Sequence, residues 1–536
     1  MKRIFKEFVF IISFVLFLSK SDVIVAKTYR ITSPTNLHGE TMVLKNGSKI
    51  VFKKNGCLIN GTLQGEKCKI VVKCKSPIFK DLLLKGEFNN TKSYLSWWYD
   101  DEDVSDEVES LLTAFKGTIF LDKPGTLTRP IVLNIGRKII VDGCGNTFKL
   151  KDVEGVGLWI KETEGFSLNS ANFSYESSNS GGKKHVGVLR IGHGEESRVI
   201  LCDVSIYGFD NSPYTPCGMS AIQIDGCNRG TETIIHDVIV KDMVVKGDGR
   251  EKNGVGSNYA ISIDCHEKEA GKVEIYNCHI SNLCNVDSSG NKIFEDSSGI
   301  YLGGAINNDI NGSMIYCDWN ASIHNCYFTD VSKRNIKIQG NYVTLRNLYS
   351  RTSDSFLKSY QNMYVGINGD YISIDGINGQ YDGAIVKMTG DHLTLRNMDC
   401  TSALRDSKYA HVIRLDGTLD AVIEDCKFDN DTYMFIYPTE RNMTETTVPE
   451  FHIKRCKLNV KNLLYCITNY TIVHNKGVLT VEDSDITLSE SYVSNSKSLA
   501  EIKLLGTKIK GKARMVAPKA SGGPRLTTSK SEIIEQ

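Results

Sequence analysis

Charged and tyrosine side chains recur at the centre of short alternating apolar segments in this chain. The clearest case is Ile336-Lys337-Ile338, and the same position of other segments holds Arg190, Gln223, Ser262, Tyr301, Gly366, Lys387 and Arg414. In two segments the residue two places further on is Asp225 or Asp264. Because alternate residues of a strand point to opposite faces, these side chains should share an outward face while their apolar neighbours point inward.

This row carries the groups that β-elimination from a uronic-acid polymer requires: a base, a proton donor and cations for the substrate carboxylate. We expect Lys337 to act as the base or to neutralise the carboxylate, and Tyr301 to protonate the leaving oxygen. Arg334, which precedes the Lys337 segment, is the expected clamp, and His266 is an alternative base. Four further members of the row are expected to bind the polymer: Arg190, Gln223, Lys387 and Arg414.

Asp225 and Asp264 occupy neighbouring repeats and leave other chemistries open. Together they could hold Ca²⁺, a hard cation that prefers carboxylate oxygens. They could instead be the acid and base of a glycoside hydrolase, which needs two carboxylates at a set separation. A third possibility is a non-catalytic glycan-binding scaffold whose aromatic rings stack on sugars. The candidate rings are Tyr259, Tyr301, Tyr364, Trp97 and Trp98. The simplest alternative is that the charges only coat an exposed sheet.

The elements that must position these residues are short strands that repeat along most of the chain. The unit at 335–347 returns in close copies at 386–397 and 413–425. Apolar residues alternate within each copy, which excludes helical repeats. A unit of about 20–30 residues with a tight glycine corner predicts three short strands per turn of a parallel β-helix, and not the four strands of a propeller blade.

Two residue types mark the corners between these strands. Asparagines recur at one corner and are expected to hydrogen-bond from one repeat to the next: Asn277, Asn325, Asn347 and Asn397. Cysteines follow at the same place and are expected to stack as small apolar residues, without disulfides: Cys278, Cys326, Cys426 and Cys456. Insertions at 305–319 and 438–448 are expected to wall a groove on one face.

The N-terminal region differs from the repeats. Residues 27–93 hold alternating runs between Asn-Gly turns, which predicts a small β module. Trp97-Trp98 comes next, and Ser105-Asp106-Glu107 opens a helix near 105–116 whose apolar residues step by three and four. Gly117-Thr118-Ile119-Phe120-Leu121 and the turn at Pro124-Gly125 follow the helix.

This order resembles the entry segment of the pectate-lyase superfamily of right-handed parallel β-helix proteins. The module before it is similar to the leaders of exported Bacteroidetes β-helix proteins. The resemblance implies an all-β fold, with a right-handed parallel β-helix over 94–509, a helix that caps its N-terminal end, and a tail or cap over 510–536. It also implies action on a polysaccharide.

Polygalacturonases of this superfamily combine several aspartates with Gly-His-Gly and Arg-Ile-Lys motifs. This chain contains Gly192-His193-Gly194, and Arg334-Asn335-Ile336-Lys337 approaches the second motif. The first motif lies far upstream of the second here, and no Asp-Asp pair follows it in a first strand. The resemblance therefore favours a polysaccharide lyase and keeps a hydrolase as the alternative.

The N-terminal residues indicate an exported protein, and the composition limits its partners. The chain has 536 residues and a formal net charge of +1, which gives no support to a nucleic-acid partner acting through bulk charge. Lys2, Arg3 and Lys6 precede an apolar run at 8–18, which predicts a signal peptide over 1–26. No other long apolar run follows, so we expect a secreted or periplasmic monomer without stable membrane insertion.

Overall fold

The chain divides into two compact units, each described here by itself. The structure is a computed structural model that describes residues 26–535 except 76, 100, 154, 178–185, 193–195, 201, 210–217, 247–256, 288, 294–295, 309–313, 354–362, 382–383, 403–410, 416–417, 419, 430–432, 438–449, 467–476, 490–492, 495–498 and 512–524. All but the last residue of the predicted signal peptide lies outside the described residues. No helix in the described part of the chain is long and apolar enough to cross a membrane.

Unit 1 comprises the residues up to Asp101 together with Asp106–Phe120. Its six-stranded sheet is built from parallel pairs, and its strands are β1 (Thr28–Ile31), β2 (Pro34–Asn36), β3 (Thr41–Val43), β4 (Lys49–Lys53), β5 (Cys57–Lys73) and β6 (Phe79–Phe88). A short parallel pair, β7 (Lys92–Tyr94) and β8 (Thr118–Phe120), belongs to the same unit.

Aromatic packing forms the core of unit 1. The ring of Phe79 lies 5.5 Å from that of Phe52 and 4.9 Å from that of Trp98, measured between centroids. The indole N–H of Trp98 donates to the carbonyl of Leu82 at 2.9 Å, which satisfies its one polar group. Trp97 and Trp98 are both buried, so they are core residues and not the sugar-stacking platforms that the scaffold alternative required. Trp97 falls in a 3₁₀ turn, Leu95–Trp97.

The α-helix α2 runs from Ser105 to Ala114, close to the predicted range. Asp103 caps its start, because one carboxylate oxygen accepts from the backbone N–H of Ser105 at 3.0 Å and from its hydroxyl at 2.5 Å. Asp106 and Glu107 lie in the first turn, where the helix dipole favours negative charge.

Unit 2 contains Glu102–Ser105 and Leu121–Gln536 and is built on two large parallel sheets. The first sheet has thirteen strands, each paired in parallel with the next. They are β10 (Ile131–Asn134), β13 (Val156–Glu162), β16 (Val186–Ile191), β19 (Gly218–Asp225), β22 (Ser257–Asp264), β26 (Ser297–Gly303), β31 (Arg334–Gln339), β33 (Met363–Asn368), β35 (Ala384–Thr389), β38 (His411–Leu415), β41 (Tyr433–Tyr437), β44 (Asn462–Cys466) and β47 (Val493–Ser494).

The strands of the second sheet lie in the sequence between successive strands of the first sheet, so each repeat contributes strands to both sheets. Its unit 2 strands are β9 (Gly125–Leu127), β11 (Lys138–Asp142), β12 (Thr147–Lys151), β14 (Gly165–Asn169), β15 (Ala171–Ser177), β17 (Glu196–Ile200), β18 (Cys202–Phe209), β20 (Glu232–His236), β21 (Ile239–Lys246), β23 (Glu269–Tyr276), β24 (His279–Val286), β25 (Lys292–Ile293), β29 (Asp318–His324), β30 (Tyr327–Val331), β32 (Asn341–Arg351), β34 (Ile372–Tyr381), β36 (Leu393–Arg396), β37 (Asp399–Ser402), β39 (Asp420–Glu424), β40 (Lys427–Asp429), β42 (Glu450–Lys454), β43 (Lys457–Val460), β45 (Gly477–Glu482), β46 (Asp485–Leu488), β48 (Leu499–Leu505), β49 (Lys508–Gly511), β50 (Arg525–Ser529) and β51 (Glu532–Glu535).

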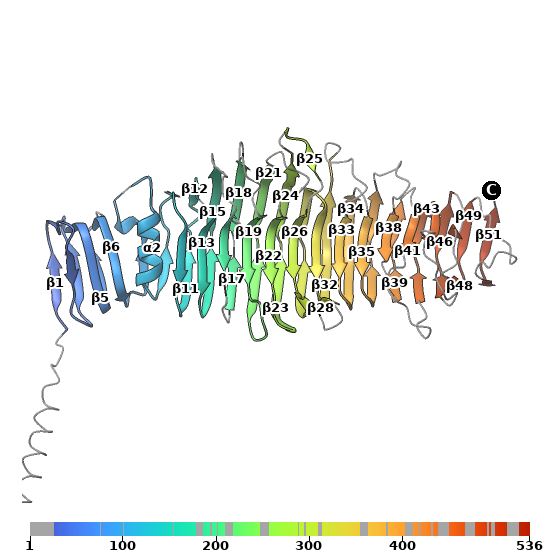
Figure 1. The fold of residues 1–536 in the computed structure, drawn as a ribbon, viewed down its shortest axis with the longest axis horizontal. Helices are drawn as coiled ribbons and strands as arrows, with labels where there is room; N and C mark the ends of the chain where they lie inside the picture. The colour runs from blue at the N-terminus through green and yellow to red at the C-terminus, as the bar shows by residue number, and fades with distance from the viewer. Residues whose placement is uncertain are drawn as a thin grey trace, which may run out of the picture. The chain divides into compact units, whose positions relative to one another are not determined.

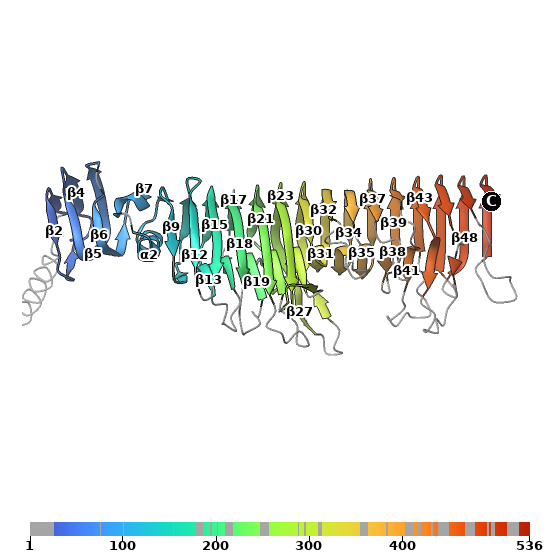
Figure 2. The ribbon, with the colours of Figure 1, turned by 90° about the horizontal axis from the view of Figure 1, so that it is seen from above.

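Figures 1 and 2 show the repeats of unit 2 side by side along the stack. The described residues are thus nearly all parallel sheet, an arrangement compatible with a β-helix solenoid. Two antiparallel pairs interrupt it: β24 with β25, and the hairpin of β27 (Ala305–Asn308) and β28 (Met314–Tyr316) within the predicted insertion. The predicted insertion at 438–448 lies outside the described residues. Strands β50 and β51 continue the parallel pairing where the sequence suggested a tail or cap.

Inward-facing apolar rows form the core between the sheets of unit 2. One row carries Ile222, Ile261, Ile300, Ile336 and Val365 through five paired strands, and all five side chains are buried. The four predicted stacking cysteines are also buried, and the cysteines whose side chains the structure describes are free. The prediction that they pack as small apolar residues is confirmed for the positions named.

The predicted asparagine corner is confirmed. Asn277, Asn325, Asn347 and Asn397 all adopt left-handed backbone conformations, with φ between 49° and 54°. Asparagine tolerates this region better than most residues. Their side-chain amides reach along the stack: Asn347 donates to Asn325 at 3.3 Å, and Asn397 donates to Asp375 at 2.7 Å.

Candidate functional site

The predicted outward row exists, and its members are partners in register on the first sheet. Arg190 pairs with Gln223, Gln223 with Ser262, Ser262 with Tyr301 and Tyr301 with Lys337. The row continues through Gly366 to Lys387 and Arg414. The residues two positions further on form a parallel row, in which Asp225 pairs with Asp264, Asp264 with Gly303 and Gly303 with Gln339.

Asp296, which directly precedes β26, gathers the cations of this face. One of its carboxylate oxygens accepts from Lys337 Nζ at 2.7 Å and from the Tyr259 hydroxyl at 2.7 Å. The other oxygen accepts from a guanidinium nitrogen of Arg334. The side chains of Lys337 and Arg334 are only 16% and 17% exposed. We call Asp296, Arg334, Lys337, Tyr259 and Tyr301 the Asp296 cluster.

Two tyrosine rings complete the Asp296 cluster. Tyr259 and Tyr301 stack with their centroids 4.6 Å apart and their planes at 25°. The ammonium of Lys337 lies 4.9 Å from the centroid of Tyr301 and 5.8 Å from that of Tyr259, within the range of a cation–π contact. The Tyr301 hydroxyl donates to the side-chain carbonyl of Gln339. Tyr301 and Lys337 are therefore held together, as the sequence predicted.

Burial and charge shift the ionisation of this cluster in three ways. Burial lowers the pKa of Lys337 although the Asp296 carboxylate opposes the shift. Burial, together with the carboxylates of Asp264 and Asp296, raises the pKa of Tyr301 well above its ordinary value. Burial alone would raise the pKa of Asp296, but the charges of Lys337 and Arg334 and the hydrogen bonds from Lys337 and Tyr259 outweigh it and hold that pKa well below its ordinary value. The cluster thus combines an ionised carboxylate with a protonated tyrosine.

A second group of polar residues surrounds the two aspartates of the parallel row. The carboxylate of Asp225 accepts from Arg190 Nε at 2.5 Å and from Gln223 Nε2 at 2.9 Å. Asp264 accepts from the hydroxyl of Ser262 at 3.3 Å. Burial and the neighbouring Asp225 charge raise the pKa of Asp264 to about 6, against a smaller opposing effect of His266. Asp264 is consequently a carboxyl group that changes protonation near neutral pH.

Gly303 makes room for the Asp264 carboxylate. A methyl group at Gly303 would lie 2.1 Å from a carboxylate oxygen of Asp264 and 2.9 Å from the Tyr301 ring. No side chain can therefore occupy this position without displacing one of them.

The arrangement at Asp225 and Asp264 does not fit a calcium site. Ca²⁺ takes six to eight oxygen ligands, but both oxygens of Asp225 already accept from Arg190 and Gln223, and Arg190 brings a positive charge. The described residues contain no group of three Cys, His, Asp or Glu side chains that could hold a metal ion. Calcium stays a prediction from the sequence, and no step proposed below depends on it.

Several predicted residues stand apart from the Asp296 cluster. His266 is exposed and follows β22, and its effect on these residues is to oppose the raised pKa of Asp264. Lys387 lies two strands beyond Lys337, with Gly366 between them, and Arg414 lies one strand further. Tyr364 is fully buried, so it is a core residue and not a sugar-stacking ring. His193 and its glycine neighbours 192–194 carry the polygalacturonase-like motif, and His193 lies outside the described residues.

Asp296 is the functional candidate that reasoning from the sequence missed. It lies just outside the alternating segment, so the period of two gave no reason to place it with the row. The available signal was its position two residues before Ser298, which pairs with Arg334. The hydrogen bond from Tyr301 to Gln339 was likewise not predicted from the sequence.

Comparisons of the chain with protein-family models, with curated proteins and with solved structures found no match.

Proposed function

We propose that this protein is an exported enzyme that cleaves a uronic-acid-containing polysaccharide by β-elimination. The observation that carries the proposal is the Asp296 cluster, where a buried lysine with a lowered pKa lies beside a tyrosine that keeps its proton. Arg334 supplies a second cation within the same cluster. These are the base, the acid and the neutralising charge that the reaction needs.

The proposed reaction moves one proton off the sugar and one onto the leaving group. The neutral amine of Lys337 takes the proton from C5 of the uronic acid, and the electron pair forms the C4–C5 double bond as the C4–oxygen bond breaks. The Tyr301 hydroxyl gives its proton to the departing oxygen. The lowered pKa of Lys337 raises the share of neutral amine at a given pH.

Arg334 is proposed to hold the substrate carboxylate. Its guanidinium has five N–H donors, and a single hydrogen bond to Asp296 leaves others for the substrate. Asp296 keeps both cations in place before substrate binds, as a counter-ion that can share them with a second carboxylate. Arg190, Gln223, Lys387 and Arg414 lie along the same face and are proposed to bind further sugar units.

The finer description of the fold belongs to this proposal. We infer a right-handed parallel β-helix of the pectate-lyase-superfamily type, supported by the parallel pairing of strands one repeat apart and by the corner asparagines. Export follows from the predicted signal peptide, and the proposed form is a secreted or periplasmic monomer whose partner is the polysaccharide.

Hydrolysis is the second candidate, and one observation favours it. Asp264 has a pKa of about 6 beside Asp225, which is ion-paired with Arg190. A glycosidase uses two carboxyl groups, one with a raised pKa as the general acid and a second as the nucleophile or base.

The products distinguish these functions. The purified mature chain would be incubated with a panel of uronic-acid polysaccharides while ultraviolet absorbance and reducing ends are both measured. A lyase yields both signals, because each cleavage leaves a double bond conjugated with the carboxylate. Reducing ends without absorbance would support the hydrolase, and retained binding without either signal would support a scaffold.

A further inference from the structure

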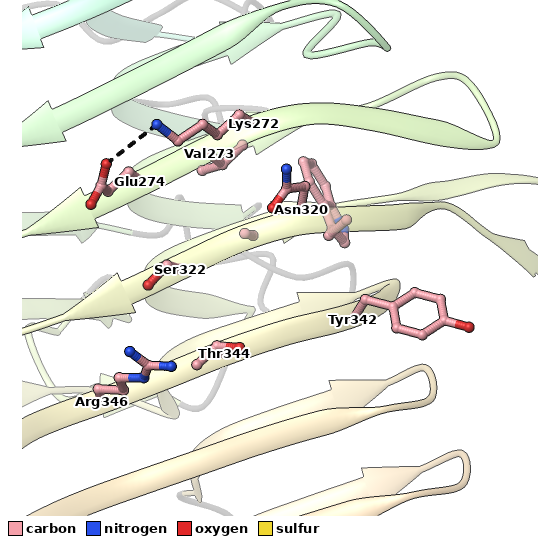
Figure 3. Close-up of a pocket in the computed structure, with 10 residues that line it drawn as sticks. Lys272, Val273, Glu274, Asn320, Ser322, Tyr342, Thr344 and Arg346 are labelled. Atoms are coloured by element: carbon pink, nitrogen blue, oxygen red, sulfur yellow. Dashed lines mark ion pairs between the residues drawn. The ribbon is translucent and has the colours of Figure 1, made fainter.

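A hollow of about 470 Å³ lies on the outward side of the second sheet, away from the Asp296 cluster. Figure 3 shows its lining on three adjacent strands: Lys272 and Glu274 on β23, Asn320 and Ser322 on β29, and Tyr342, Thr344 and Arg346 on β32. A volume of this size suits a small molecule or a short stretch of polymer. The chemistry of its two ends differs.

Tyr342 forms one end of the hollow. One face of its ring stacks on Tyr371 of the next repeat, with centroids 4.8 Å apart and planes at 7°. Tyr371 directly precedes β34, which pairs with β32 on the side away from the hollow, so the other face of Tyr342 is turned toward the hollow. The side chain is 50% exposed although it is large and aromatic. A flat aromatic face held by a stacked neighbour is a platform for a sugar ring.

Arg346 forms the other end of the hollow, four residues along the same strand and therefore about 13 Å from Tyr342. Among the described residues no ion pair or hydrogen bond engages its exposed side chain. In the same row, by contrast, Arg396 is paired with Glu424 at 3.0 Å. A guanidinium without a protein partner is suited to bind a carboxylate with two N–H groups.

The floor between these ends is small and polar. Ser322 and Thr344 present hydroxyl groups from neighbouring strands, and both are partly exposed. The single carboxylate of the lining, Glu274, lies 3.5 Å from His324 Nε2 and 3.8 Å from Lys272 Nζ. Lys272 is also paired with Glu232 at 2.9 Å, so Arg346 is the cation of the lining that an anionic ligand would meet.

The corner next to the hollow is short. β31 ends at Gln339 and β32 begins at Asn341, so one residue, Gly340, separates the strand of Lys337 from the strand of Arg346. A methyl group at Gly340 would lie 2.3 Å from the Trp319 ring. The outward faces of the two sheets therefore meet at this repeat without an intervening loop.

We propose that the hollow between Tyr342 and Arg346 is a second, non-catalytic binding site for an acidic saccharide. A sugar ring stacks on Tyr342, its neighbours lie over Ser322 and Thr344, and a carboxylate is held by Arg346. The proposal rests on the proposed function for the choice of an acidic polymer, and it adds a site that holds the same chain outside the Asp296 cluster.

Binding by the mature chain tests this site. Oligogalacturonate, oligomannuronate and carboxyl-reduced oligogalacturonate would each be titrated calorimetrically into a catalytically impaired Lys337→Ala protein and into the same protein carrying Arg346→Ala or Tyr342→Ala. The matched controls are Arg396→Ala, from the same row, and Tyr349→Ala, an exposed tyrosine of β32 outside the hollow.

We expect that at least one acidic oligosaccharide binds and that carboxyl reduction weakens its binding. Arg346→Ala and Tyr342→Ala should each weaken binding about tenfold or more, whereas the two control variants should not. Tenfold corresponds to about 1.4 kcal/mol, the order of one charge-assisted contact or one stacked ring. Binding unaffected by either hollow variant overturns the inference even if the wild type is a lyase. Binding lost in both variants supports it even if no cleavage product forms.

Discussion

Asp296 is placed where an ion pair contributes measurably to stability. Its two partners, Arg334 and Lys337, are mostly shielded from water, and the carboxylate itself is 32% exposed. Exposed pairs are worth little because water screens them, whereas removing one member of a shielded set leaves the other charges uncompensated. Asp296 therefore has a structural role that is separable from the chemistry of Lys337.

Asp296→Asn is expected to lower the stability of the protein at pH 7 by about 1–3 kcal/mol, between the values for exposed and buried ion pairs. The folded-state pKa of Asp296 is depressed, so its contribution is present above the ordinary pKa of about 4 and is lost as the pH falls through the folded value. Thermal midpoints measured between pH 7 and pH 2 check this, because the loss begins only below about pH 4. A deficit that stays constant down to pH 2 would contradict the ion-pair account.

Asp264 should show the opposite dependence. Its pKa is raised to about 6, so the folded protein binds more protons than the unfolded chain between about pH 4 and pH 6, and stability falls as the pH rises through that window. Asp264→Asn removes the penalty and is expected to stabilise the protein by about 1–3 kcal/mol at pH 8, with little effect near pH 4.

Chemical denaturation at these two pH values measures the effect, with exposed Asp485→Asn as the control. A variant that is equally destabilised at both pH values would show that Asp264 is not the titrating group.

At this scale the sequence predicted which residues share a row but not all of their partners. Lys337 and Tyr301 are adjacent because side chains alternate along each strand and the two strands pair in register, which places the two residues side by side on the outward face. The partner that holds Lys337, Asp296, lies outside the periodic segment, and its approach depends on the path of the chain before β26. The burial of Trp98 and Tyr364 also depends on packing, which the residue types alone do not determine.

The first sheet positions the site by its close repeat-to-repeat spacing. Strands of one sheet lie about 4.7–4.9 Å apart, so groups on successive strands meet without any loop contributing. Such a surface holds its side chains rigidly and needs glycine where a neighbouring side chain folds across the backbone. Gly303 between Asp264 and Gln339 is such a position.

Gly303→Ala should displace the Asp264 carboxylate or the Tyr301 ring, because the added methyl group would come within 2.1 Å of the carboxylate. We expect a stability loss of about 1–3 kcal/mol, as for other overpacked sites, and a shifted pH dependence of activity. Gly136→Ala is the control, since nothing lies within 4 Å of its added methyl group. Equal thermal midpoints and pH profiles for the two variants would refute this role for Gly303.

The corners of the repeats were accessible from the sequence because they are encoded locally. An asparagine before a cysteine at the end of a strand predicts a left-handed residue followed by a small buried one, as at Asn277 and Cys278. The bounds of α2 were predictable for the same reason. The β27–β28 hairpin was not, because its residues show neither strict alternation nor a two-residue turn.

Taken as a whole, unit 2 presents two differently equipped faces that meet at Gly340. The first sheet carries buried titratable groups, and the second carries exposed tyrosine, hydroxyl and arginine side chains. The charged residues of the first face made that face predictable from the sequence. The binding surface of the second face was not predicted, because serine, threonine and tyrosine are ordinary residues of exposed strands.

The central claim is that Lys337 is the base of an elimination reaction, and the initial rate of unsaturated product tests it most directly. Lys337→Ala should lower that rate by about 10²–10⁴-fold, the usual contribution of a positioned general base. Lys149→Ala, an exposed lysine of β12, should leave it unchanged. A Lys337→Ala enzyme that folds and keeps the full rate of unsaturated product would contradict the account.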